Sequence, residues 1–245
     1  MLGLGNSILS DYKHVFLDDY SIQLDGTDQY INCDAIVGVT EWNTIHEQGG
    51  ISIWIKIDET TSTGNIIRMQ ADSSNFISIY YHAGSNETRT AYKGGGSTTV
   101  ASSDAGIEGD GNWHHVVSTW NTITNKISLY LDGSLAESKP NSGSLPTFTG
   151  EISTVDIGQN TSGSADFKGF VNDVAIYNKA LSSANASDMY NNGIPKDFIS
   201  NPTHNDGLIA YYKFETGTGI NVTDHTANRL DVTLVNEAAW STSTP

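Results

Sequence analysis

The chain is poor in cysteine, which excludes two common ways of stabilising a small fold. Among its 245 residues there is one cysteine, Cys33. It can form no intramolecular disulfide and no cysteine-based zinc site, and we expect it to be a small, half-buried residue within a strand. No apolar run approaches the ~18 residues that a membrane helix needs. We therefore expect a fold that depends on a hydrophobic core, with no membrane partner.

Basic residues are also scarce. Lys and Arg number 12 against 28 Asp and Glu, which gives a formal net charge of -16. A nucleic-acid-binding protein needs a basic patch, and here no basic residues cluster, so we expect no nucleic-acid partner. The acidic balance fits a solubilised surface, carbohydrate or calcium contacts, or a basic partner, and it selects none of these. The first residues, MLGLGNSILSDYK, lack the basic and long apolar regions of a secretory signal, and we expect none.

Short stretches in which apolar and polar residues alternate predict strands along most of the chain. Gly-rich or Ser-rich turns separate them, and Asp132-Gly133 is typical of a hairpin turn. The clearest predicted strands are residues 51–57, 77–82, 113–120, 127–131 and 170–177. This pattern favours an all-β fold with two antiparallel sheets packed as a sandwich.

One segment, residues 182–190, has the pattern of a short helix. Ser182 is a suitable N-cap, and Gly193 is expected to stop the helix at its C-terminal end.

Five motifs in a fixed order resemble the laminin-G-like domains of the concanavalin A-like lectin and glucanase superfamily. They are LDGTDQYI (24–31), ISIWIK (51–56), GNWHHVV (111–117), LYLDG (129–133) and FKGFVNDVAIYNKAL (167–181). The resemblance implies a concanavalin A-like jelly-roll sandwich.

We divide the chain into an N-terminal arm (1–20), the jelly-roll sandwich (21–200) and a C-terminal strand block (201–245). In the family, a segment similar to residues 207–239 normally precedes the opening strand, whereas here it follows the domain. Either the strand order is permuted and the block completes the sandwich, or a second repeat is truncated. We favour permutation, because an unpaired apolar strand would promote aggregation. The arm contains the apolar residues Leu2, Leu4, Ile8 and Leu9, and we expect it to dock on a neighbouring subunit or a shell protein.

The family includes glycosidases, but the sequence does not favour one. A retaining glycosidase needs two carboxylates about 5–5.5 Å apart. The nine glutamates include no two separated by four or five residues. The adjacent His114 and His115 would point to opposite faces of a strand, so they cannot share a metal and are expected to be packed. We expect no enzyme activity.

The resemblance implies one structural calcium ion. The expected ligands are Asp173, in the last family motif, with Asp25 and Asp28 in the opening turn. Hard oxygen ligands suit calcium. Asn172 stands where the family often has an additional Asp, and Asp173 could equally cap a turn.

Glycan recognition by this fold uses aromatic rings on loops or on a sheet face. The aromatic residues opposite the isoleucine rows include Tyr80, His82 and Tyr130, which are the predicted glycan-binding residues; Trp54 is expected to be packed.

The appearance of the chain resembles that of accessory proteins of tailed-phage virions. We therefore expect a non-enzymatic capsid decoration, fibre or appendage protein on the virion surface, forming a homo-oligomer or contacting other virion proteins. The alternative is a carbohydrate-binding or adhesion module of a bacterial surface protein, located outside the cell. A glycoside hydrolase is the third and least favoured hypothesis.

Overall fold

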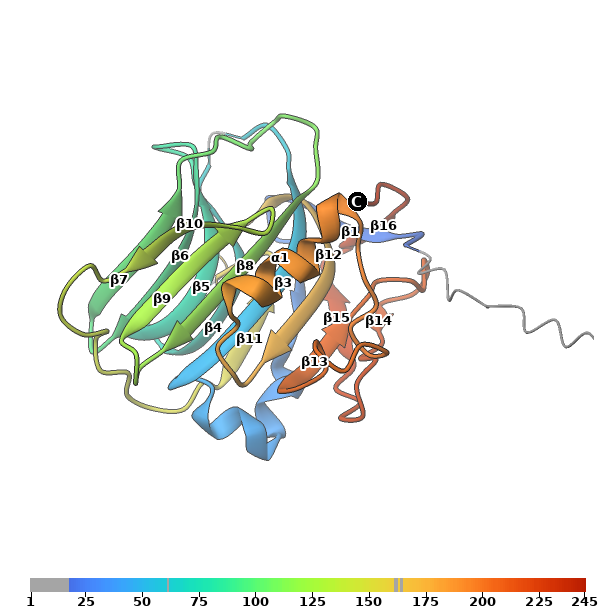
Figure 1. The fold of residues 1–245 in the computed structure, drawn as a ribbon. Coiled ribbons are helices and arrows are strands. Elements are labelled where there is room, and N and C mark those ends of the chain that lie inside the picture. The colour runs from blue at the N-terminus through green and yellow to red at the C-terminus, as the bar shows by residue number, and fades with distance from the viewer. Residues whose placement is uncertain (1–17, 61, 161–162, 164) are drawn as a thin grey trace, which may run out of the picture.

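Alternating apolar residues build two antiparallel sheets that pack face to face (Figure 1). The computed structural model describes residues 18–60, 62–160, 163 and 165–245. In this part of the chain each sheet has eight strands, and one α-helix is present. The predicted all-β sandwich with one short helix is confirmed. No helix in the described ranges has both the length and the apolar character that a membrane crossing requires.

The first sheet, sheet A, has the strand order β10-β9-β8-β3-β12-β1-β16, and β13 also pairs with β12. Its strands are β1 (Ser21–Asp25), β3 (Gln48–Ile57), β8 (His114–Asn121), β9 (Lys126–Leu131), β10 (Ser134–Lys139), β12 (Lys168–Tyr177), β13 (Leu208–Tyr212) and β16 (Ala239–Ser241). Four of the predicted strands lie here.

The second sheet, sheet B, has the order β14-β15-β2-β11-β4-β5-β6-β7. Its strands are β2 (Tyr30–Asn32), β4 (Gly64–Asp72), β5 (Asn75–His82), β6 (Glu87–Gly94), β7 (Ser97–Ser103), β11 (Thr154–Ile157), β14 (Asn221–Val222) and β15 (Val232–Val235). The main core lies between the two sheets, where the predicted isoleucine rows of β3 and β5 meet.

The helix α1 (Ser183–Tyr190) begins where the sequence predicts. Ser182 and Asn185 form a reciprocal capping box, which satisfies backbone donors at the first turn. The C-terminal end differs from the prediction, because Asn191 adopts the left-handed conformation (φ 49°) and caps the helix before Gly193. A 3₁₀ turn, Asn191–Gly193, follows.

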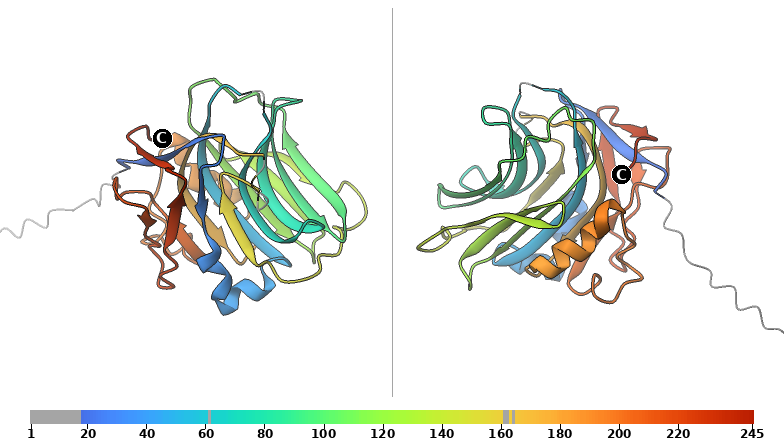
Figure 2. Two further views of the ribbon diagram at one scale, coloured as in Figure 1. Left: turned by 180° about the vertical axis from the view of Figure 1, so that it is seen from behind. Right: turned by 45° about the horizontal axis from the view of Figure 1, so that its top comes forward.

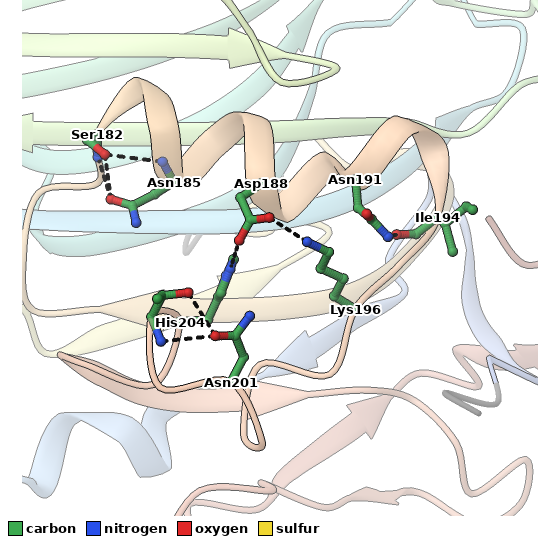
Figure 3. Close-up of polar contacts among 9 residues, drawn as sticks. Ser182, Asn185, Asp188, Asn191, Ile194, Lys196, Asn201 and His204 are labelled. Atoms are coloured by element: carbon green, nitrogen blue, oxygen red, sulfur yellow. Dashed lines mark hydrogen bonds and ion pairs between the residues drawn. The ribbon is translucent and has the colours of Figure 1, made fainter. Parts of the chain in front are cut away.

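Helix α1 covers the outer face of sheet A. Apolar residues of the helix, of the segment after it and of the sheet form a second, smaller cluster. A polar clamp adds to it: Asp188 accepts from Lys196 Nζ and from His204 Nε2, each at 2.5 Å (Figure 3). His204 also stacks on Phe198, with ring centroids 5.1 Å apart. The helix is therefore fixed to residues 195–208 as well as to the sheet.

The C-terminal strands join both sheets. β13 pairs with β12, β15 pairs with β2, and β16 pairs with β1. In Figure 1 these strands lie on the side of the sandwich where β1 enters. The predicted arm falls almost wholly within residues 1–17, which lie outside the described residues.

Candidate functional site

The outer faces of the two sheets differ in what covers them. Sheet A lies under α1, whereas no described helix lies over the outer face of sheet B, which the left view of Figure 2 presents. We name the outward side chains of β4, β5 and β6 the open face. Its members include Arg68, Gln70, Phe76, Ser78, Tyr80, His82, Glu87, Arg89, Ala91 and Lys93, which strand register places opposite or beside one another. This is the surface of the sandwich that is best placed to meet a ligand.

Two of the three predicted glycan-binding residues meet on the open face. Tyr80 and His82 lie two positions apart on β5, and their rings contact edge to face with centroids 6.4 Å apart. His82 Nδ1 lies 2.9 Å from Ser85 Oγ, which also accepts from Arg89 Nη2. Both aromatic side chains are half-buried. They present ring surface that is held in place and still reachable.

The third predicted residue, Tyr130, lies elsewhere. It belongs to β9 of sheet A, packs into the cluster beneath α1 and is 7% exposed. Burial raises the pKa of its hydroxyl. The structure therefore separates Tyr130 from Tyr80 and His82, and the three cannot form one groove.

Arg68 was not singled out from the sequence, but it has an unusual environment. It is half-buried on β4, and its guanidinium carbon lies 3.6 Å from the centroid of the Phe76 ring. Its Nε donates to Gln70 Oε1 at 2.7 Å. No carboxylate of the described chain forms a salt bridge with it. Burial lowers the pKa of this guanidinium to about 10, because a desolvated cation is destabilised.

Carboxylates border the open face on its β11 side. Asp156 stands opposite Arg68 in the register of β4 and β11, but it accepts from Gln159 Nε2 at 3.3 Å. Burial raises the pKa of Asp156 to about 6, and the nearby Asp34 adds to the shift. The face thus has hydrogen-bond donors, acceptors and aromatic rings side by side, which is the set of groups that sugar hydroxyls and ring faces need.

The predicted calcium ligands are not brought together. Asp25 pairs with Lys168 at one end of β12, while Asp173 lies five residues further along the same strand. At about 3.3 Å per residue the two are roughly 16 Å apart, whereas calcium ligands lie within 2.6 Å of the ion. Asp25 and Asp28 are near Asp166, whose pKa is raised by burial first and then by these two charges. The opening turn therefore cannot complete a site at Asp173.

A different carboxylate lies near Asp173. Asp173 is 1% exposed, and its Oδ1 accepts from the Tyr211 hydroxyl at 2.7 Å. Asp18 accepts from Asn172 Nδ2 at 2.5 Å. The Oδ2 atoms of Asp18 and Asp173 are both buried without a hydrogen-bond partner. Burial raises the pKa of both carboxyls, and the charge of Asp18 raises that of Asp173 further.

These two carboxylates fit a cation in part. Each has one unpartnered oxygen, and calcium takes its remaining ligands from carbonyl groups and water. The described residues contain no group of three or more His, Cys, Asp or Glu arranged to hold a metal. A bound calcium ion would thus depend on Asp18 and Asp173, where it would supply charge compensation.

The histidine pair is packed, as the sequence predicts. His114 lies between two carboxylates, with Nδ1 2.8 Å from Asp132 Oδ2 and Nε2 2.9 Å from Asp110 Oδ2. His115 Nε2 lies 2.8 Å from Ser52 Oγ. The side chains of His115 and Ser52 are both fully buried. Burial lowers the pKa of His115 to about 3. This Ser–His pair lies beneath α1, so it has no access to a substrate.

The family is established by a model of the concanavalin A-like lectin/glucanase superfamily, of laminin-G type, which matches residues 25–187. The match covers more than half of the chain, and the chain belongs to this superfamily. No curated protein matches the sequence.

Similar solved structures share the fold at low sequence identity. A protein of Bacteroides ovatus whose proposed role is carbohydrate binding is 15% identical, with a TM-score of 0.64; the match covers 91% of this chain and 59% of that one. The CBM40 module of a Ruminococcus gnavus sialidase is 14% identical, with a TM-score of 0.57 over 69% of this chain and 96% of that one. A heptameric pentraxin of Limulus polyphemus is 20% identical, with a TM-score of 0.50 over 71% and 82%.

Proposed function

We propose that the protein binds carbohydrate through the open face of sheet B and catalyses no reaction. The observation that carries this proposal is the contrast between the two sheets. Sheet A is covered by α1, whereas sheet B presents the half-buried rings of Tyr80 and His82 beside charged groups. The carbohydrate-binding proteins among the similar structures support a role for this fold in glycan binding.

The test is binding to a panel of immobilised glycans, followed by titration of each glycan that is retained. Tyr80→Ala should weaken binding by about ten-fold or more, since an aromatic anchor contributes well over 1 kcal/mol to many sites. Tyr130→Phe on sheet A is the matched control and should bind like the wild type. Equal binding by Tyr80→Ala, His82→Ala and the wild type would mean that the glycan does not bind at the open face. Release of reducing sugar from a bound glycan would contradict the non-catalytic part.

We propose calcium as a structural ion held by Asp18 and Asp173. A ligand that binds only the folded state at 100 times its Kd stabilises it by about 2.7 kcal/mol. Calcium should therefore raise the melting temperature of the wild type and leave that of Asp173→Asn unchanged. An equal rise in melting temperature for both proteins would mean that calcium binds at another site. No rise for either protein would mean that calcium does not bind.

The virion role, the oligomer and the position outside the cell stay predictions of the sequence. A virion protein should co-sediment with phage particles after lysis, and an oligomer should show its mass in light scattering. A monomer that is absent from particles would favour the alternative, a glycan-binding module of a bacterial surface protein.

A further inference from the structure

We propose that the glycan bound at the open face carries a carboxylate, and that Arg68 recognises it. This inference rests on the proposed function and names the class of sugar. It begins from the two contacts of Arg68, the hydrogen bond with Gln70 and the packing on the Phe76 ring, neither of which neutralises its charge.

The first step concerns geometry. The Arg68 guanidinium lies 3.6 Å above the Phe76 ring, and Nε is held by Gln70 Oε1. These two contacts leave the Nη1–Nη2 edge without a hydrogen-bond partner in the described structure. That edge carries two parallel N–H groups, which match the two oxygens of a carboxylate.

The second step concerns charge. The chain has 12 basic residues against 28 acidic ones, yet Arg68 is half-buried with no carboxylate within salt-bridge distance among the described residues. Asp156, its register neighbour, turns to Gln159 instead. A desolvated cation without a counter-ion costs stability, and an anionic ligand would offset that cost. Lys93 adds a second positive charge, with Nζ 5.3 Å from the centroid of the same Phe76 ring.

The third step limits the kind of anion. A formal net charge of -16 repels densely charged polymers over about one Debye length, ~8–10 Å. One guanidinium edge suits one planar, singly charged group. The expected ligand is therefore an oligosaccharide with an isolated acidic sugar, such as a uronic acid or a sialic acid, rather than a polyanion.

The experiment compares each acidic sugar with a neutral partner: the galacturonate pair differs in the esterified carboxylate alone, whereas lactose lacks the whole sialic acid residue. The probes are 3′-sialyllactose with lactose, and a galacturonate disaccharide with its methyl ester, titrated by calorimetry. At least one acidic probe should bind ten-fold or more tighter than its neutral partner. Arg68→Gln should weaken that acidic probe by about ten- to a hundred-fold and should leave the neutral partner unchanged, as expected for a charge-assisted hydrogen bond.

Two controls separate recognition from general charge. Arg229→Gln removes the same charge from an exposed turn and should bind like the wild type. Phe76→Leu should weaken the acidic probe in the wild type but not in Arg68→Gln, because Phe76 is a positioning residue that acts through Arg68. Melting curves check that each variant is folded.

The outcomes are distinguishable. If neutral glycans of the panel bind at the open face and no acidic probe is preferred, the carboxylate inference is wrong while the proposed function stands. If Arg68→Gln and Arg229→Gln weaken the acidic probe equally, the preference is long-range and the inference is also wrong. If no glycan binds, acidic or neutral, both fail.

Discussion

Asp18 gives the sharpest test of the electrostatics around β12. Burial raises the pKa of its carboxyl from 3.8 to about 6; Asn172 opposes the shift, and Glu215 adds to it. The folded protein therefore keeps this proton to a higher pH than the unfolded chain. The contribution of Asp18 to stability is complete below about pH 4 and is lost as the pH rises through 6.

The size of the effect follows from the shift. About 2 pKa units correspond to ~3 kcal/mol, and contact of Asp18 with water reduces this to about 1–2 kcal/mol. Asp18→Asn keeps an oxygen that can accept from Asn172 and carries no charge. We expect this variant to be more stable than the wild type at pH 8 by that amount. For a chain of this size the melting temperature should rise by roughly 2–8 °C.

The assay is thermal unfolding in EDTA at pH 5 and pH 8, followed by circular dichroism. The advantage of Asp18→Asn should be smaller at pH 5, where the wild-type carboxyl is largely protonated. Asp19→Asn is the matched control, because Asp19 is exposed and the charge change is the same. The reasoning fails if Asp18→Asn has no advantage at pH 8, or if Asp19→Asn has an equal one.

Three further substitutions or deletions test the packing. Truncation after residue 200 removes the strands β13 to β16 and the fully buried side chain of Tyr211. The truncated chain should therefore lose its cooperative melting transition. A truncated chain that melts like the full-length protein would show that the C-terminal block is dispensable for stability. His204→Ala removes a hydrogen-bond partner of Asp188 and should destabilise the folded protein by about 1–3 kcal/mol. Hydrogen exchange in α1 should become faster, while glycan binding should not change. Unchanged hydrogen exchange in α1 would contradict the role of the clamp. Gly169→Ala would place a Cβ 2.2 Å from the Lys56 carbonyl oxygen at φ 149°, so it should destabilise severely, while Gly38→Ala, which meets nothing within 4 Å, should not.

Local periodicity was enough to predict the fold class and the clearest strands. In β3 the isoleucines occupy alternate positions, and alternation of two residues is a property of the strand itself. The start of α1 is equally local, because Ser182 and Asn185 cap it through groups three residues apart. Its end was less predictable. Asn191, Asn192 and Gly193 all have positive φ, and the first of them, Asn191, is the residue that ends the helix.

The candidate site was predictable only where one strand contains it. Tyr80 and His82 share a face because they are two positions apart on β5. Tyr130 satisfies the same local rule, but the sequence does not show which outer face α1 will cover. Arg68 and Phe76 meet across neighbouring strands, so their contact depends on register. An arginine within the strand Gly64–Asp72, next to Ile66, Ile67 and Met69, was the one local signal available.

The expected calcium ligands of the opening turn lie away from Asp173 for a topological reason. An edge of β12 pairs with β1 over Val171 to Lys168 and with β13 over Val174 to Tyr177. Between these two pairings the strand bulges, with Asp173 at φ 45°. The start of β1, which follows Asp18, therefore lies at the bulge, and its end at Asp25 lies away from it. Because β1 pairs with only the first part of β12, the residues before β1 lie near the middle of β12, and the turn after β1 lies at its start.

Because this bulge lies on sheet A and the open face lies on sheet B, the stability of the fold and the recognition of a ligand should be separable. Asp173 meets Tyr211 on the side of sheet A that faces α1, whereas Arg68 projects from the outer face of sheet B. Two packed sheets about 10 Å apart lie between the two groups, and sites at that separation usually contribute additively. Asp18→Asn combined with Arg68→Gln should therefore show the sum of the two single changes in unfolding free energy, within about 0.5 kcal/mol. Its affinity for an acidic sugar should equal that of Arg68→Gln alone. A coupling energy well above that limit would mean that the bulge of β12 and the open face communicate through the core, and that the two roles cannot be assigned to separate sheets.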